Sequence, residues 1–320
     1  MRQRTVLTIG EYEDWSADSV ADELTRRGVR NYRLDTADFP QRMKMSARNR
    51  APGWCGRIET AAGQLDLEEV TAVYYRKPRQ FDLSPALSEP ERRFARAQAR
   101  VGVGGVLSSL RVRWMNLPAA IADAESKPRQ LDIAADVGLA TPPTLISNDP
   151  SDVRAFAADV GRIIVKPLAE PIVHEGGGYT AVYTRIVASR ELDSLAGVAA
   201  TAHLFQAWVP KSYEVRVTVV GRQVFPVAIH AGSEAARVDW RTDYTSLRYE
   251  VIDCPPKILA GIHQYFDAFG LLYGALDFVV TPDDSWVFLE CNASGQWGWL
   301  AEECQLPVAA AIATELMGNG

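Results

Sequence analysis

Residues Gly274–Trp299 read GALDFVVTPDDSWVFLECNASGQWGW and decide the fold of the C-terminal part of the chain. Two apolar runs flank a polar Pro-Asp-Asp turn, a pattern that predicts a β-hairpin. Side chains alternate along a strand, so Glu290 and Asn292 share one face, Cys291 faces the other way, and Asp277 on the partner strand can face the first pair. Three oxygen ligands without His or Cys suit Mg²⁺ shared with substrate phosphates. A solvated acidic hairpin edge is the alternative.

Composition narrows the class of protein. The chain has 320 residues, 47% hydrophobic and 23% charged, as in a folded globular protein with two or three lobes. A net charge of −6 gives a nucleic-acid partner no electrostatic support. The four cysteines form no CxxC pair, so reduced thiols in a cytoplasmic protein are the simplest interpretation. Neither a signal peptide nor an apolar run of roughly 18 to 20 residues is present, so we expect no membrane partner.

The N-terminal part, residues 1–115, is predicted to be an α/β lobe. Strand patterns at Thr5–Ile9, Val29–Leu34 and Val70–Tyr75, with a helix pattern at Ser16–Arg27, favour a parallel sheet. No GxGxxG follows the first strand, so the sequence does not support a dinucleotide site.

Two further parts follow. Residues 116–203 form a central part that contains a predicted helix at Gln130–Val137 and a predicted strand at Arg162–Lys166. Residues 204–320 alternate strands with one long helix, Lys257–Phe269. The whole chain is therefore expected to be α/β (α+β).

Lys166 ends an apolar strand, where a lysine is often only a surface charge. Here Gly176, Gly177 and Gly178 follow ten residues later, as a flap over a polyphosphate would require. Glycine permits positive φ and close approach of backbone N–H groups to phosphate oxygens.

The segment Phe205–Pro210, FQAWVP, is short and apolar and can offer backbone hydrogen bonds and an apolar wall to an adenine. Lys211 and Glu214 follow it. Arg216 lies in the alternating pattern Tyr213–Val219, where its side chain can point toward a phosphate.

Five elements in this order resemble the ATP-grasp superfamily: SKPRQLDIAADVGLATPPT with Lys127, IIVKPL with Lys166, FQAWVPKSYEVRV, ALDFVV and FLECNASGQW. More narrowly, YYRKP, WMNLPAAIADAESKPRQL, VDWR and FLECNASGQWGWL resemble the branch that makes microviridin-like, side-chain-cyclised ribosomal peptides, the graspetides. The resemblance runs from about Val70 to the C-terminus and more loosely over the N-terminal lobe. It implies an ATP-grasp fold with a Rossmann-like parallel-sheet lobe, a central lid domain and a C-terminal antiparallel ATP-binding domain.

The resemblance also implies a role for each matching residue. Nucleotide-binding roles fall on Lys127 and Lys166 (α- and β-phosphates), Gly176, Gly177 and Gly178 (lid), Gln206, Ala207, Trp208, Val209 and Lys211 (adenine hinge) and Glu214 (ribose). Catalytic roles fall on Arg216 (γ-phosphate) and on the Asp-x-Arg pair Asp239 and Arg241 near the reacting carboxylate. Two Mg²⁺ ions would be held by Asp277, Glu290 and Asn292. Pro128 departs from the leucine of many members, but proline is tolerated at a helix start, so we expect a helix to begin there.

The implied activity is that of an ATP-dependent peptide macrocyclase. It would activate Asp or Glu side chains of a ribosomal precursor peptide as acyl phosphates and join them to Thr or Ser hydroxyls or Lys amines, releasing ADP and phosphate. An ATP-dependent ligase that adds an amino acid to a peptide or protein is one alternative, and a silent binding protein is another. The Asp-x-Arg pair and the GQW ending favour the macrocyclase.

The partner implied by the resemblance is a precursor peptide with a leader and a core. The segment Ala181–Ala202 could hold the leader, although an ordinary amphipathic helix plus hairpin is the alternative. Trp297 and Trp299 would line a groove for the core or simply pack in the interior. By analogy with the family, a homodimer is expected.

Overall fold

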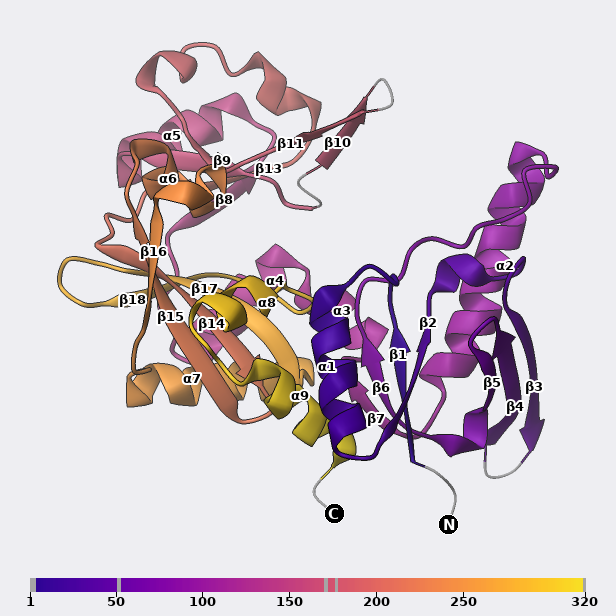
Figure 1. The fold of residues 1–320 in the computed structure, drawn as a ribbon. Helices are drawn as coiled ribbons and strands as arrows, with labels where there is room; N and C mark the ends of the chain where they lie inside the picture. The colour runs from indigo at the N-terminus through magenta and orange to yellow at the C-terminus, as the bar shows by residue number, and fades with distance from the viewer. Residues whose placement is uncertain (1–3, 51–52, 170–171, 176–177, 319–320) are drawn as a thin grey trace.

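The computed structural model describes residues 4–50, 53–169, 172–175 and 178–318, and it shows the predicted mixed α/β protein (Figure 1). None of the described helices is both long enough and apolar enough to cross a membrane. The parallel sheet, the central sheet and the C-terminal sheet follow one another along the chain, with smaller sheets inserted into the first two. The boundaries near residues 115 and 203 remain predictions.

The N-terminal lobe has a parallel sheet in the order β2-β1-β6-β7, as predicted. Its elements are β1 (Thr5–Ile9), α1 (Trp15–Arg26), β2 (Arg30–Leu34), β6 (Val70–Tyr75), α2 (Glu89–Ser108) and β7 (Arg113–Met115). Asp14 starts α1, because its carboxylate accepts the N–H groups of Ser16 and Ala17. Leu7 and Ile9 pack toward α2, whereas Val6 packs toward α1.

An antiparallel meander in this lobe was not predicted. It consists of β3 (Lys44–Arg50), β4 (Gly53–Thr60) and β5 (Gly63–Asp66). The meander and α2 cover the same face of the parallel sheet, since Ile58 and Leu65 share a core with Val103 and Leu107.

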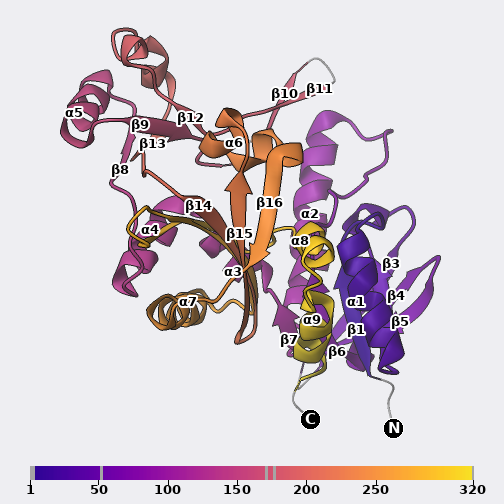
Figure 2. The ribbon, with the colours of Figure 1, turned by 60° about the vertical axis from the view of Figure 1, so that its left-hand side comes forward.

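The other face of the parallel sheet is covered partly by the end of the chain. Helix α9 (Val308–Met317) packs on α1, and Figure 2 shows the two helices side by side. Ile312 and Leu316 share a core cluster with Leu24 and Tyr74. The first and last elements of the chain therefore stabilise each other.

The central part carries an antiparallel sheet in the order β12-β9-β13-β8 and a separate hairpin, β10–β11. Its elements are α3 (Pro118–Ala124), α4 (Lys127–Asp136), β8 (Thr144–Ser147), α5 (Pro150–Val160), β9 (Ile163–Lys166), β10 (Ile172–Glu175), β11 (Gly178–Ala181), β12 (Arg185–Ile186) and β13 (His203–Ala207). Helix α4 begins at Lys127 with Pro128 in its first turn, as expected. An amphipathic helix within 181–202 is wrong, because this segment forms only β12 and two short 3-10 turns.

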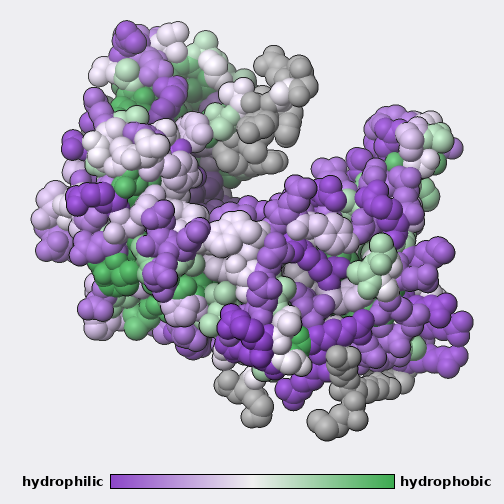
Figure 3. Space-filling model, in the orientation of Figure 1, coloured by the Kyte–Doolittle hydropathy of each residue, from purple (hydrophilic) through white to green (hydrophobic). Residues whose placement is uncertain are grey.

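The C-terminal part is built on an antiparallel sheet in the order β16-β15-β14-β17-β18. Its elements are β14 (Tyr213–Val220), β15 (Gln223–Ala231), α6 (Glu234–Val238), β16 (Leu247–Val251), α7 (Pro256–Phe269), β17 (Tyr273–Val280), β18 (Trp286–Asn292), α8 (Gly298–Glu303) and α9. The predicted hairpin is β17–β18 and the predicted long helix is α7, whereas α6, α8 and α9 were not predicted. Asp277 pairs with Glu290, and a bulge follows between Asp277 and Phe278. Figure 3 shows a broad hollow between the α5 lobe and the protruding α2.

Candidate active site

The hairpin β17–β18 places its oxygen-bearing side chains together, as the alternation of its residues predicts. Both carboxylate oxygens of Asp277 accept from Nη1 of Arg216, at 3.0 and 2.8 Å. Asn292 donates to Asp277 at 3.3 Å. Cys291 points the other way and is buried in the core. Asp277 is thus fixed between a buried guanidinium and the amide of the neighbouring strand.

Glu290 is surrounded by positive charge. Its Oε2 accepts from Nζ of Lys127 at 2.6 Å, and its Oε1 lies 3.8 Å from Nη1 of Arg241. Burial on its own would raise the pKa of Glu290, but the charges of Lys127 and Lys166 lower that pKa to about 2. Burial in turn lowers the pKa of Lys166 to about 8. The site therefore holds an ionised carboxylate among cations that could turn toward a phosphate.

Gln130 on α4 sets the distance between that helix and β18. Its Nε2 donates to the carbonyl of Cys291 at 2.9 Å, and its Oε1 accepts the N–H of Cys291 at 2.8 Å. The side chain continues the hydrogen bonding of the strand edge, so α4 cannot slide along β18. Lys127, one turn earlier, is thereby held opposite Glu290.

The segment after β13 offers free polar groups to a pocket. Gln206 is fully buried, and its Nε2 donates to Thr144 at 2.9 Å, whereas nothing among the described residues donates to its Oε1. The N–H of Val209 likewise has no acceptor within the part of the chain that the structure describes. An unpaired donor and an unpaired acceptor beside apolar walls match the edge of a purine base.

Lys211 and Glu214 form a pair at 2.6 Å at the side of this pocket. Burial raises the pKa of Glu214 to about 7, while the charge of Lys211 opposes the increase. The ammonium of Lys211 also lies 5.3 Å from the ring centroid of Trp208, a cation–π contact that fixes the indole.

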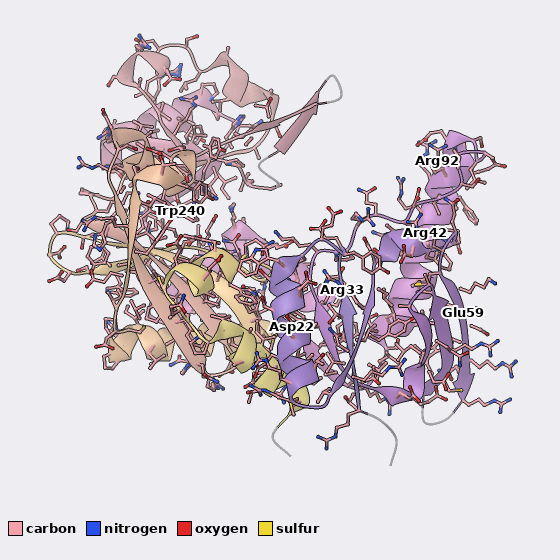
Figure 4. The ribbon with its side chains drawn as sticks, viewed as in Figure 1. Asp22, Arg33, Arg42, Glu59, Arg92 and Trp240 are labelled. Atoms are coloured by element: carbon pink, nitrogen blue, oxygen red, sulfur yellow. The ribbon has the colours of Figure 1, made fainter. Side chains whose placement is uncertain are left out.

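Asp239 and Arg241, the Asp-x-Arg pair, are joined by two hydrogen bonds of 2.8 Å each. Asp239 is buried and also accepts the N–H of Thr184 at 3.3 Å. The guanidinium of Arg241 is thereby held over Glu290. Trp240 between them stacks on Trp299 at 5.3 Å, and Figure 4 shows Trp240 where the upper sheet meets the lower one.

The structure brings most of the predicted residues to one pocket. Its lining includes Lys166, Gln206, Ala207, Trp208, Val209, Lys211, Glu214, Asp239, Arg241, Asp277 and Glu290. A second, adjoining chamber of about 780 Å³ is lined by Lys127 and Asn292 and again by Lys166, Arg241 and Glu290. Arg216 is buried and is not among the lining residues of either cavity, and it hydrogen-bonds to Asp277, which lines the first. Gly178 begins β11, whereas Gly176 and Gly177 lie outside the described residues.

A buried network that the sequence did not reveal supports the site from the N-terminal lobe. Arg76 donates to Asp14 and to the side-chain oxygen of Gln296, both at 2.9 Å. The backbone carbonyl of Gln296 accepts from Nη2 of Arg216 at 3.3 Å. Trp297, which follows, is buried and packs in the core rather than lining a groove. The network joins residues that are far apart in the chain, so no local sequence pattern predicts it.

The donor set fits Mg²⁺ that is completed by phosphate oxygens. In the described part of the chain, no group of three or more His, Cys, Asp or Glu could hold a metal by itself. Asp277 and Glu290 supply carboxylates and Asn292 supplies an amide oxygen, which are ligands that Mg²⁺ prefers. Two carboxylates with substrate phosphates are the usual arrangement for Mg²⁺ in phosphoryl-transfer sites.

Comparison with known proteins identifies the family. Residues 5–122 match the model of the MvdD pre-ATP grasp domain. Macrocyclase MdnC from Microcystis aeruginosa MRC, solved with precursor peptide MdnA, is 30% identical, with a TM-score of 0.87 over 98% of this chain and 100% of that chain. Macrocyclase MdnB from the same organism is 30% identical, with a TM-score of 0.83 over 99% and 100%.

A third structure is that of a RiPP-associated ATP-grasp ligase from Chryseobacterium gregarium, in complex with ADP and a leader and core peptide. It is 26% identical, with a TM-score of 0.89 over 98% of this chain and 97% of that chain. No curated protein matches the chain in sequence. The chain belongs to the ATP-grasp superfamily, in its microviridin-type (graspetide) branch of ligases.

Proposed function

We propose that the protein is an ATP-dependent peptide macrocyclase. It activates Asp or Glu side chains of a ribosomal precursor peptide as acyl phosphates and joins them to Thr or Ser hydroxyls or to Lys amines. The observation that carries the proposal is one continuous pocket and chamber that combine a hinge, a cluster of cations and a pair of carboxylates. The MdnC and Chryseobacterium structures, which hold precursor peptides, support the peptide partner.

ATP would lie with its adenine between Trp208 and the free groups of Gln206 and Val209. Glu214, ionised when the ribose hydroxyls donate to it, would hold the sugar. Lys127 and Lys166 would neutralise the α- and β-phosphates. The Chryseobacterium ligase, solved with ADP, supports this assignment.

Two Mg²⁺ ions, held by Asp277, Glu290 and Asn292, would neutralise charge on the phosphates. Arg216 would turn part of its guanidinium from Asp277 toward the γ-phosphate. The resting pairs, Arg216 with Asp277 and Lys127 with Glu290, keep these groups in place before the nucleotide arrives.

The reaction has two steps. First, an oxygen of the peptide carboxylate attacks the γ-phosphorus, the bond from that phosphorus to the β-bridging oxygen breaks, and ADP leaves with the electron pair. Next, a hydroxyl oxygen or amine nitrogen of the same peptide attacks the acyl carbon. The bond from this carbon to the phosphoryl oxygen breaks, and phosphate leaves and takes up the proton of the nucleophile. Arg241 would neutralise the carboxylate side of this exchange.

The leader of the peptide would bind the central sheet. A cavity of about 230 Å³ there is lined by Arg185, Glu191, Val198 and Phe205. Arg185 and Glu191 pair at 2.8 Å and would exchange that pair for charges of the leader. Replacing both by alanine should weaken leader binding and leave ADP binding unchanged.

The protein would act as a cytoplasmic homodimer. Helix α2 protrudes from the molecule (Figure 1). Phe94 and Val101 lie two turns apart on the same face of this helix, and they are 68% and 69% exposed. A second copy would cover this face. A Phe94→Glu and Val101→Glu double variant should have the molar mass of a monomer in light scattering, and a wild type that is already monomeric would refute the dimer.

The test of the activity is the intact mass of the short peptide encoded beside this gene, after co-expression with the protein. We expect the loss of one or more whole water molecules, which should be absent with Lys166→Ala and with Asn292→Ala. A mass gain of one amino-acid residue would instead indicate a peptide ligase. An unchanged mass together with no peptide-stimulated ADP release would contradict the proposal.

A further inference from the structure

We propose that the N-terminal-lobe wall of the large chamber, centred on Lys77, binds the side-chain carboxylate of the peptide that is to be phosphorylated. The inference rests on the proposed function and adds to it a site for the acyl donor. The chamber of about 780 Å³ is lined by Lys127, Lys166 and Arg241 and, from the N-terminal lobe, by Lys77.

The segment after β6 holds Lys77 in place. Arg76 points into the core and is anchored by Asp14 and Gln296, and Lys77, which the following Pro78 keeps extended, points away from it and lines the chamber. The N–H of Glu11 donates to the carbonyl of Lys77 at 3.2 Å. The backbone beneath the lysine is therefore held from both sides.

Lys77 is also a chamber cation outside the nucleotide pocket, and burial and the charge of Arg76 lower the pKa of its ammonium. Lys127 pairs with Glu290, and Arg241 pairs with Asp239. Among the described residues, no carboxylate oxygen lies within the 4.0 Å of an ion pair from Lys77. Lys166 belongs to the nucleotide pocket as well, whereas Lys77 lines only the chamber.

The chemistry of the first step requires a cation there. The attacking carboxylate is an anion, and it must approach a triphosphate that is more strongly charged. Like charges repel strongly at close range in a site of low effective dielectric, so a carboxylate without a cation beside it is disfavoured in the chamber. An ammonium outside the nucleotide pocket neutralises the carboxylate without competing for the phosphates. Lys77 remains unchanged through both steps.

The carboxylates whose charges act on Lys77 are those of Asp14, which already pairs with Arg76, and of Glu11. A purely structural role for Lys77 would be long-range pairing with Glu11. In that case Glu11→Gln and Lys77→Met would have the same effect, and the double variant would add nothing. In our proposal, Glu11→Gln leaves the affinity for the peptide carboxylate intact.

The experiment is a binding cycle on the full-length protein with ADP and Mg²⁺. The probe is the short peptide encoded beside this gene, together with a copy in which the core Asp and Glu are replaced by Asn and Gln. We expect the wild type to bind the acidic peptide at least 10-fold more tightly than the amide copy. Lys77→Met should abolish this preference, Lys77→Arg should restore part of it, and Lys257→Met, an exposed lysine on α7, should leave it unchanged.

The cycle separates this inference from the proposed function. ADP affinity should stay within 2-fold in Lys77→Met, because the residue does not line the nucleotide pocket. A Lys77→Met protein that still prefers the acidic peptide, or a wild type without such a preference, would overturn the carboxylate site. If the preference for the acidic peptide depends on Lys77 but the wild type forms no ring, the carboxylate site is supported and the macrocyclase activity is rejected.

Discussion

Replacing Gly295 by alanine tests whether Arg216 must keep its position over Asp277. A Cβ at residue 295 would lie 2.9 Å from Nη2 of Arg216, 3.0 Å from Cβ of Ala275 and 3.1 Å from Cβ of Asn292. Each distance is 0.3 to 0.5 Å shorter than the 3.4 Å at which ordinary contact begins.

The backbone at Gly295 cannot easily move away. Its N–H donates to the carbonyl of Asn292 at 3.1 Å, and its carbonyl accepts from the hydroxyl of Tyr273 at 2.6 Å. The guanidinium of Arg216 is the group that must yield, and it then leaves the carbonyl of Gln296 and turns from Asp277. Overpacking of this kind costs about 1–3 kcal/mol. At about 1.4 kcal/mol for each factor of ten, we expect kcat/KM to fall about 5- to 150-fold.

The assay is peptide-stimulated ADP release, with thermal unfolding of the same protein samples. Gly102→Ala is the matched control, because nothing lies within 4 Å of its Cβ on exposed helix α2. That control should keep full activity and gain up to about 1 kcal/mol of stability. If Gly295→Ala has the activity of the wild type, Arg216 does not depend on this position and the reasoning is refuted.

Three other predictions follow from buried charges. Asp14→Asn keeps a helix-capping oxygen but leaves the charge of Arg76 without its partner. The free energy of unfolding measured in urea should therefore fall by about 3–5 kcal/mol. A decrease under about 1 kcal/mol would mean that Arg76 is solvated. The raised pKa of Glu214, about 7, means that the folded chain binds more protons than the unfolded chain between pH 4.5 and 7. The unfolding free energy of the wild type should therefore fall relative to Glu214→Gln as pH rises through that window, and parallel curves would contradict the burial of this carboxyl. Lys127→Met should weaken ADP binding about 10- to 100-fold in calorimetry, because a charge-assisted hydrogen bond contributes about 1.5–3 kcal/mol, while an unchanged affinity would remove Lys127 from the nucleotide site.

The parts of the site that depend on local periodicity could be predicted from the sequence. Glu290 and Asn292 share a face because side chains alternate, and the pairing of Asp277 with Glu290 confirms the hairpin. The Arg76–Gln296 contact, between residues 220 positions apart, has no such local signal. Its two ends meet only because separate sheets pack together.

Two missed regions have different physical reasons. Strand β3 reads KMSARNR and exposes most of its side chains, so no apolar alternation marks it. Helix α9 reads VAAAIATELM and is apolar on nearly all sides, so no helical alternation of apolar and polar residues is visible in its sequence. Only Pro307, directly before it, marks its start. Tertiary packing, rather than a local pattern, determines both elements.

The packing of α9 on α1 has a consequence for synthesis of the chain. Val6, Leu24 and Tyr74 share their core with Ile312 and Leu316, which are synthesised long after the first sheet. One face of that sheet therefore stays uncovered until α9 (Val308–Met317) has been synthesised and can pack on it. A nascent chain that stalls before residue 308 exposes this apolar face, which makes it a target for chaperones and a nucleus for aggregation.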